Sequence, residues 1–319
     1  MPTDHLTINP YRMAALVEAT ISGTSAEATA AETGIDVNDL ADAVQTYKAA
    51  GLAALQRQHA SIWYHALIRP HDWTTAEALF RVEIAPHLDR LDGEGTPWWF
   101  LRKHPYWRIR VRTTDHDAAS TLLDELATTG VIADWRPGIY EPETAAFGGD
   151  TPMAIVHELF CADSRGMLHY TGADPHSTGR RELSLLHIRA LQHSAGLDWF
   201  EAADVFDQVA QMRPTPPTAD ATRVQRLADQ MRPLLALPAD ARTALFAPDG
   251  PLTPANDWHL AFIRAGEQYA EAARAGHLRR GARAALAQIV IFHWNRLDLP
   301  AHTQAILARA ATAAILPGS

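Results

Sequence analysis

The spacing of apolar residues changes twice along the chain and predicts three regions. Residues 1–58 show short helical periodicities that end at glycines, as Tyr11–Ser22 ends before Gly23. Residues 59–178 mix alternating strand patterns with amphipathic helices, and residues 179–319 carry helical patterns throughout. We therefore predict an α+β fold, in which a small N-terminal helical module precedes a central mixed α/β part and a C-terminal helical part.

The charges of the N-terminal module argue against DNA binding. Its predicted helices cover 11–22, 25–33 and 37–50, and Gly51 is the predicted end of the third. A helix, a glycine-containing turn and a second helix also describe a helix-turn-helix. Within 1–58, however, seven acidic residues oppose only three lysines and arginines, whereas a DNA reader needs the opposite balance. We expect a packing or peptide-docking module instead.

The spacing of apolar residues also predicts the remaining helices, strands and connectors of the mixed and helical parts. The mixed part is predicted to contain a strand from Ser61, helices over 74–91 and 115–129, two strand pieces within 131–143 that break at Pro137-Gly138, and a helix from Thr151 to Asp163. The helical part is predicted to contain helices over 181–194, 199–212, 219–237, 256–275 and 280–297, with Pro-rich connectors over 213–218 and 247–254.

The segment Trp98–Arg112 is the most distinctive stretch of the mixed part. It predicts two strands that fold back on each other around Lys103-His104-Pro105. Because successive side chains of a strand point to opposite faces, the apolar residues of the second strand share one face. The other face carries Arg108, Arg110 and Arg112, and no acidic residue alternates with them. We expect this row of guanidinium groups to handle anions, with a solvated sheet face as the alternative.

Composition excludes several classes of protein. The chain has 319 residues and a formal net charge of −9, which argues against a general nucleic-acid binder. Cys161 is its single cysteine, which excludes an intrachain disulfide and a cysteine-rich metal site. No signal peptide or membrane-spanning apolar run is visible, so the expected location is the cytoplasm. Phosphate-binding glycine loops, nucleophile elbows and paired metal-ligand spacings are also missing, and we predict no metal and no cofactor.

Three polar clusters interrupt the apolar segments and are candidates for a site. In the first, Glu141 and Glu143 follow Tyr140 and are predicted to share a strand face, where a carboxylate would orient an arginine or move a proton. A structural salt bridge is the alternative. The second cluster lies at the end of a nearly apolar helix. Such a helix is expected to be buried, and its polar side chains then need hydrogen-bond partners inside the protein. Its members are Gln288, His293, Asn295 and Arg296. The third is Asp163-Ser164, for which a helix C-terminal cap is the alternative.

The order of several motifs resembles the C-terminal, SpaB-type domain of class I lanthipeptide dehydratases over residues 60–310. The motifs are WWFLR, Arg108-Ile109-Arg110, YEPETAAFGG, LFCADS and FHWNR. The domain also occurs as a stand-alone protein among thiopeptide-type bacteriocin biosynthesis proteins. The resemblance implies a leader-bearing peptide whose serines and threonines a partner has glutamylated, and elimination of glutamate to leave dehydroalanine or dehydrobutyrine. A divergent branch, the pyridine synthases of thiopeptides, instead joins two dehydroalanines in a formal aza-[4+2] cycloaddition, with loss of water and of the leader as an amide.

One departure from the pattern of the eliminating members favours the cyclase branch. The residues that match theirs are Arg108, Arg110, Glu143 and His293. Ala146, however, stands where those members have an arginine, and Phe147 replaces a tyrosine. The missing arginine would help to hold the departing glutamate, whose carboxylates need bidentate partners.

For the cyclase, the resemblance assigns roles within residues 59–319. We expect His293 and Tyr140 to transfer protons, with Glu143 as the orienting carboxylate. Arg108 and Arg110 would polarise carbonyls or grip the peptide. The expected substrate-binding residues are Arg112, Trp99, Trp107, Asp163, Ser164, Gln288, Asn295 and Arg296.

The expected partners are the leader-bearing modified precursor peptide and other enzymes of the same pathway. The leader is expected to dock on the N-terminal helices or an adjoining sheet edge. Two alternatives to the cyclase stay open: a stand-alone glutamate-eliminating domain, and a non-catalytic peptide-binding partner. Separate placement of Arg108, Glu143 and His293 would favour the second alternative.

Overall fold

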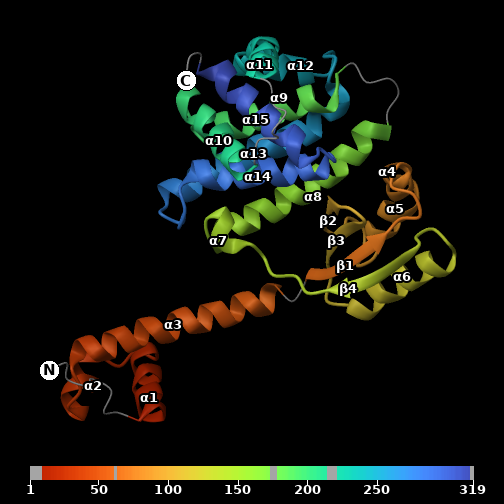
Figure 1. Cartoon of the computed structure of the whole chain (residues 1–319). Coiled ribbons are helices and arrows are strands. Elements are labelled where there is room, and N and C mark those ends of the chain that lie inside the picture. Colours follow the sequence, from red (N-terminus) through yellow and green to blue (C-terminus); the bar gives the residue numbers. More distant parts are fainter. Residues whose placement is uncertain (1–8, 61–62, 173–177, 214–220, 317–319) are drawn as a thin grey trace. The chain divides into compact units, whose positions relative to one another are not determined.

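The chain forms two units, Met1–Ser61 and Ile62–Ser319 (Figure 1). The computed structural model describes residues 9–60, 63–172, 178–213 and 221–316.

The first unit consists of three helices around a small core of its own. The helices are α1 (Pro10–Ile21), α2 (Ala26–Thr33) and α3 (Val37–Ala60). The core contains Val17, Ala30, Leu40 and Val44. The three predicted helices are confirmed, but the prediction that Gly51 ends the third is wrong. Good helix formers follow this glycine, and a glycine inside a helix costs only about 1 kcal/mol relative to alanine.

The second unit contains a four-stranded antiparallel sheet, which confirms the α+β class. Its strands are β1 (Trp63–Arg69), β2 (Trp98–Lys103), β3 (Tyr106–Arg112) and β4 (Asp134–Gly138), in the order β2-β3-β1-β4. The predicted hairpin is β2 and β3. The start that was predicted for the first strand, Ser61, lies outside the described residues.

The predicted second strand piece before residue 143 is wrong. β4 runs through Pro137 and ends at Gly138, because a strand at the sheet edge tolerates a residue without an N–H. Glu141 and Glu143 therefore share no strand face. Glu143 instead lies immediately before the short helix α7 (Thr144–Phe147), and its side chain is exposed.

Helices cover one face of the sheet. The predicted helix over 74–91 is present as a continuous helical stretch, α4 (Ala76–Leu79), the π-helical turn η1 (Phe80–Ile84) and α5 (Ala85–Leu88). Pro86 lacks the N–H that a regular α-helix would use there, which accounts for the irregular turn. Phe80 of this stretch stacks on Trp107 with ring centroids 4.7 Å apart. The predicted helix after the hairpin is α6 (His116–Thr128), capped by Asp115.

Helix α8 (Asp150–Gly172) connects the sheet to the helical half. Its start agrees with the prediction, but its predicted end at Asp163 is wrong, because the helix continues for two more turns. Gly166 does not break it. A Cβ at this position would lie 2.3 Å from Cγ of Trp258, so the glycine makes room for a close helix crossing. Asp163 and Ser164 consequently lie inside the helix, and the C-cap alternative is excluded.

Seven helices and one 3-10 turn make up the described part of the helical half. They are α9 (Arg180–Ser194), α10 (Trp199–Met212), α11 (Ala221–Leu235), α12 (Ala239–Phe246), η2 (Thr253–Ala255), α13 (Asn256–Arg274), α14 (Ala282–Arg296) and α15 (Ala301–Ile315). Five were predicted. α12 and α15 were missed because both are rich in alanine, which blurs the contrast between apolar and polar faces. Among the described helices, none is long and apolar enough to cross a bilayer.

Candidate active site

The sheet face opposite α4, η1 and α5 carries the row of arginines, as the hairpin pattern predicted. We call it the arginine face. Pairing across the strands places His65 of β1 and Trp99 of β2 on either side of Arg110 of β3. Arg108 is half-buried, Arg110 is 6% exposed and Arg112 is exposed, so the middle arginine of the row is the most buried.

Arg110 is a buried cation without an acidic partner. Its guanidinium carbon lies 4.3 Å from the ring centroid of Trp99 and 5.5 Å from that of Tyr140. No acidic side chain of the described residues forms an ion pair with Arg108, Arg110 or Arg112. Burial lowers the pKa of Arg110 to about 10, so the group remains protonated at neutral pH. Burying a charge without a counter-charge costs free energy unless hydrogen-bond acceptors satisfy it.

Several buried polar atoms on the arginine face have no hydrogen-bond partner among the described residues. They are Nε of Arg108, Nε of Arg110, Nε1 of Trp99 and Nε2 of His65. Nδ1 of His65 donates to the carbonyl oxygen of Ile139 at 3.0 Å, and burial lowers the pKa of His65 to about 4, so Nε2 carries a free lone pair at neutral pH. Native interiors satisfy most buried polar groups. Three unpaired donors and one unpaired acceptor, all fully buried, therefore indicate a polar interior at the arginine face that its described neighbours do not satisfy.

Tyr140 and His157 form a hydrogen-bonded pair beside Arg110. The phenol oxygen lies 2.6 Å from Nε2 of His157, which comes from the third turn of α8. Burial raises the pKa of Tyr140. Burial and the charges of Arg110 and Arg112 lower the pKa of His157 to about 4. Both groups are therefore neutral at pH 7, and the pair can donate a proton at one atom and accept one at the other.

The single cysteine lies close to this pair but is unsuited to nucleophilic chemistry. Cys161 is buried one helical turn after His157. Burial raises the pKa of its thiol to about 12, and the reactive thiolate is thus disfavoured.

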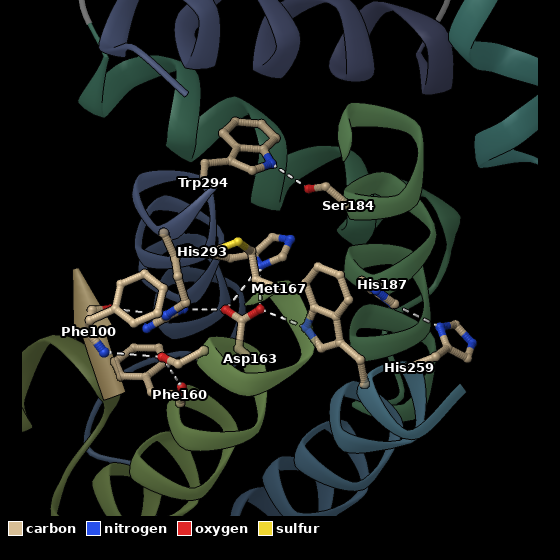
Figure 2. Close-up of polar contacts among 12 residues, drawn as sticks. Phe100, Phe160, Asp163, Met167, Ser184, His187, His259, His293 and Trp294 are labelled. Atoms are coloured by element: carbon tan, nitrogen blue, oxygen red, sulfur yellow. Dashed lines mark hydrogen bonds and ion pairs between the residues drawn. The ribbon is translucent and has the colours of Figure 1, made fainter. Parts of the chain in front are cut away.

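A second polar cluster is sealed inside the helical half around Asp163 (Figure 2). Nδ1 of His293 donates to the two carboxylate oxygens at 2.9 and 3.0 Å, and the indole of Trp258 donates to one of them at 2.8 Å. Arg296 forms an ion pair with the same carboxylate. All four side chains are at least 95% buried, so a peptide substrate cannot reach this cluster.

The Asp163 cluster reaches the sheet through the backbone of β2. Arg296 donates from Nε to the carbonyl oxygen of Phe100 at 3.1 Å, and the N–H of Phe100 donates to the hydroxyl of Ser164 at 3.1 Å. Figure 2 shows Phe100 and Phe160 next to the carboxylate. These bonds fix the strand that carries Trp99 against α8 and α14.

The structure brings together only part of the predicted site. Arg108, Arg110, Tyr140 and Trp99 lie on or beside the arginine face. Glu143 is exposed but close enough to act electrostatically on Arg110 and Tyr140.

The remaining predicted residues lie elsewhere. Trp107 is buried on the opposite face of the sheet, against Phe80. Gln288 contacts the sulfur of Met212 at 3.0 Å, and Asn295 accepts a hydrogen bond from Gln304 at 2.8 Å. The residues held in the Asp163 cluster or bonded to it are His293, Arg296, Asp163 and Ser164.

His157 and His65 were missed from the sequence. His65 becomes a neighbour of Arg110 only through strand register. His157 had a detectable signal, since it shares one side of α8 with Phe160, Cys161 and Ser164 at helical spacing.

Comparison with known proteins defines the class to which this architecture belongs. Residues 63–315 match the family described as lantibiotic biosynthesis dehydratase C-term. The chain belongs to this family, which confirms the resemblance expected from the sequence. The helices of the first unit lie outside the matched residues. No curated protein matches the sequence.

Three solved structures share the fold at low identity. The tRNA-dependent lantibiotic dehydratase MibB from Microbispora sp. 107891 has a TM-score of 0.54 and 21% identity, over 79% of this chain and 28% of MibB. This chain thus spans little more than a quarter of MibB. The pyridine synthase TbtD from thiomuracin biosynthesis has a TM-score of 0.53 and 15% identity, over 80% of this chain and 98% of TbtD. TsrL has a TM-score of 0.50 and 18% identity, over 79% of this chain and 98% of TsrL.

Proposed function

We propose that this protein is a cofactor-independent pyridine synthase of thiopeptide biosynthesis. It would join two dehydroalanines of a leader-bearing peptide in a formal aza-[4+2] cycloaddition, then release water and the leader amide. The observation that carries the proposal is the neutral Tyr140–His157 pair beside Arg110, whose Nε has no hydrogen-bond partner among the described residues. The resemblance of fold to the pyridine synthase TbtD supports it.

The guanidinium groups of the arginine face fit the carbonyl groups of a modified peptide. Arg108 and Arg110 would hold two carbonyl oxygens through their terminal guanidinium nitrogens and thereby set the separation of the two dehydroalanines. Holding reacting groups in the right geometry lowers a barrier by as much as about 7–11 kcal/mol. A cycloaddition needs little covalent chemistry from the protein, so such positioning supplies the largest effect.

The Tyr140–His157 pair would supply the proton transfers. One dehydroalanine must react through the iminol form of its amide, in which the proton has moved from nitrogen to oxygen. The phenol would give its proton to that oxygen and take up the proton that the amide nitrogen loses. At leader release it would give a proton to the departing amide nitrogen and take up the proton that the ring carbon loses, while His157 holds the phenol through their hydrogen bond.

His293 lies apart from the arginine face, the placement expected to favour a non-catalytic binding partner, and the proposed chemistry therefore rests on Tyr140 and His157. The side chain of His293 has no exposed surface and is bonded to Asp163. We assign it a positioning role, in which the Asp163 cluster holds β2 and α8 in register, and we give the proton transfer to Tyr140 and His157.

A glutamate-eliminating domain is the second candidate, because paired guanidinium groups also suit a glutamyl carboxylate. The alanine at position 146 argues against a glutamate-eliminating activity. Its carbonyl oxygen accepts from Arg280, and the next residue, Phe147, packs its ring 5.2 Å from that of Phe292 in the core. Neither side chain supplies the guanidinium and phenol of the eliminating pattern.

Mass spectrometry of two leader-linked peptides separates the candidates. One peptide carries two dehydroalanines and azoles, and the other carries a glutamylated serine. We expect the purified protein to convert the first into a cyclised core that has lost water and the leader amide, and to leave the second unchanged. Loss of glutamate from the second peptide would identify an eliminase, and no change in either would identify a binding partner.

We also propose that the first unit docks the leader. It has its own core and lies outside the family match, and it exposes large apolar side chains such as Tyr11, which is 86% exposed, and Ile21. Removing residues 1–61 is expected to weaken binding of a fluorescent leader peptide at least about 10-fold, or 1.4 kcal/mol, in an anisotropy titration. Unchanged affinity would contradict the assignment.

A further inference from the structure

The helical half contains a polar cavity far in the fold from the arginine face. Its volume is about 370 Å³, and it lies between α9, α12 and α13. Figure 1 shows α12 on the side of the helical half that faces away from the sheet. The lining residues are Ala190, His193, Ser194, Ala239, Arg242, Thr243, His259, Ile263 and Glu267.

Arg242 is the buried cation of this cavity. It is 4% exposed, and one guanidinium nitrogen, Nη1, donates to the carbonyl oxygen of Leu237 just after α11. Among the described residues it forms no ion pair. Within the part of the chain that the structure describes, its Nε and Nη2 have no hydrogen-bond partner, and neither is among the fully buried unpaired atoms, so they reach the cavity.

Capping of the end of α11 does not account for these free donors. The nearby Arg189 also caps that end, through a 3.3 Å bond from Nε to the carbonyl oxygen of Leu235, and it uses Nη1 on Gln192 at 2.8 Å. Arg189 is therefore occupied on two nitrogens, whereas Arg242 keeps two free. Arginine's planar fork suits a carboxylate that accepts two parallel hydrogen bonds.

His259 adds a third donor to the same wall. It is 2% exposed, stacks on Phe246 at 3.8 Å and shares a hydrogen bond between its Nδ1 and Nδ1 of His187 at 3.1 Å. Burial lowers the pKa of His259 to about 4 and that of His187 well below its ordinary value, so both rings are neutral.

The proton positions follow from the cost of burying an unpaired N–H. Nε2 of His187 is buried without a partner. A bare ring nitrogen there costs less than an orphaned N–H, so His187 donates from Nδ1 and His259 accepts. The remaining proton of His259 is then on Nε2, which has no hydrogen-bond partner among the residues that the structure describes and is not fully buried. It donates into the cavity.

The charge around the cavity favours a single negative charge in the ligand. Arg242 and the more distant Arg189 are the buried cations, and His193 is exposed with a pKa lowered by burial and by both arginines. Glu267, exposed two turns after His259 on α13, adds a negative charge at the rim and disfavours a dianion.

We propose that this cavity binds a small monocarboxylate, held by Arg242 and by the Nε2–H of His259. The carboxylate belongs either to a free amino acid or to the C-terminus of a peptide. The site is separate from the arginine face, so the proposal stands independently of the cyclisation chemistry.

Ligand-observed NMR on the full chain tests the proposal. The probes are L-alanine, a short peptide with a free C-terminus, the same peptide amidated, and inorganic phosphate. At about 10 mM, above the millimolar affinity expected of one charge-assisted contact, we expect the alanine or the free peptide to bind and the amidated peptide and phosphate not to bind. Which carboxylate binds identifies its source.

Two variants and one native measurement locate the binding. Arg242→Gln is expected to weaken carboxylate binding at least about 10-fold, whereas Arg264→Gln, an exposed arginine of α13 outside the lining, should not change it. In the unmodified protein, the ring nitrogen resonances of His259 should shift on titration, which keeps the test valid if Arg242→Gln misfolds. Preference for phosphate, unchanged affinity in a folded Arg242→Gln protein, or unshifted His259 resonances with any bound probe would overturn the proposal, as would no binding at all.

Discussion

Replacing Tyr140 with phenylalanine is expected to lower kcat for release of the cyclised core by about 10²–10⁴-fold and to change KM little. The substitution removes only the hydroxyl that lies 2.6 Å from Nε2 of His157, and the ring continues to pack beside Arg110. Binding of the peptide by the arginines should therefore survive while proton transfer does not. Steady-state kinetics with the bis-dehydroalanine peptide measure both constants.

A tyrosine of the sheet itself is the control. Tyr106 is half-buried on β3, where its ring lies 4.9 Å from the guanidinium carbon of Arg136, and Tyr106→Phe should leave kcat within about two-fold. Equal losses in both variants would mean that loss of a tyrosine hydroxyl in or beside the sheet is disruptive by itself. Full activity in Tyr140→Phe would exclude the phenol from the chemistry.

The pH dependence of the unmodified enzyme tests the same pair. His157 is expected to become protonated only near pH 4, and the pKa of Tyr140 is raised above its ordinary value of 10.0. The rate constant kcat/KM should therefore be flat across neutral pH and fall in acid as His157 gains a proton and ceases to accept. A fall centred between pH 6 and 7, where an unperturbed histidine titrates, would contradict the neutral pair.

The largest expected loss of stability follows from Asp163→Asn. The carboxylate is 1% exposed and neutralises Arg296, which has no exposed surface, while also accepting from His293. Removing one partner of a buried ion pair leaves the other charge uncompensated and costs about 3–5 kcal/mol. Urea unfolding followed by tryptophan fluorescence measures the change in the free energy of unfolding.

An exposed ion pair of the same unit is the control. Asp134 pairs with Arg69, and the two side chains are 47% and 45% exposed, so Asp134→Asn should cost at most about 1 kcal/mol. A loss of similar size in the two variants would show that the Asp163 cluster is not a special source of stability.

The acid dependence of stability should change in the same variant. Burial by itself would raise the pKa of Asp163, but the attraction of His293 and Arg296 outweighs it, and the pKa lies below its ordinary value of 3.8. A depressed carboxyl pKa contributes stability that is present above the ordinary value and is lost as pH falls through the folded value. Asp163→Asn should therefore lose less stability in acid than the unmodified protein does.

Local patterns predicted the parts of the fold that depend on short stretches of chain. The alternation in the hairpin correctly placed Arg108 and Arg110 on one face, because strand geometry has a fixed period of two. Glycine was a weaker guide. Gly51 and Gly166 are both inside helices, the first because good helix formers follow it and the second because Trp258 occupies the space of its missing side chain.

The sequence predicted the candidate site only where it also determines the direction in which a side chain points. Helix α14 is apolar on nearly all sides, so its pattern cannot show that His293 points towards Asp163 and away from the arginine face. His157 joins Tyr140 through tertiary packing of α8 on the sheet, which no short-range pattern encodes. The motif order identified the family, but the partners of each polar residue required the structure.

Carbon-13 NMR of the reaction product tests the central claim most directly. The substrate would carry a ¹³C label at the methylene carbon of each of the two dehydroalanines. If the protein is a pyridine synthase, the labelled carbons become bonded to each other as adjacent aromatic CH groups, and a new one-bond coupling between two aromatic resonances appears in the product. Two uncoupled vinyl resonances after incubation with folded protein would contradict the account.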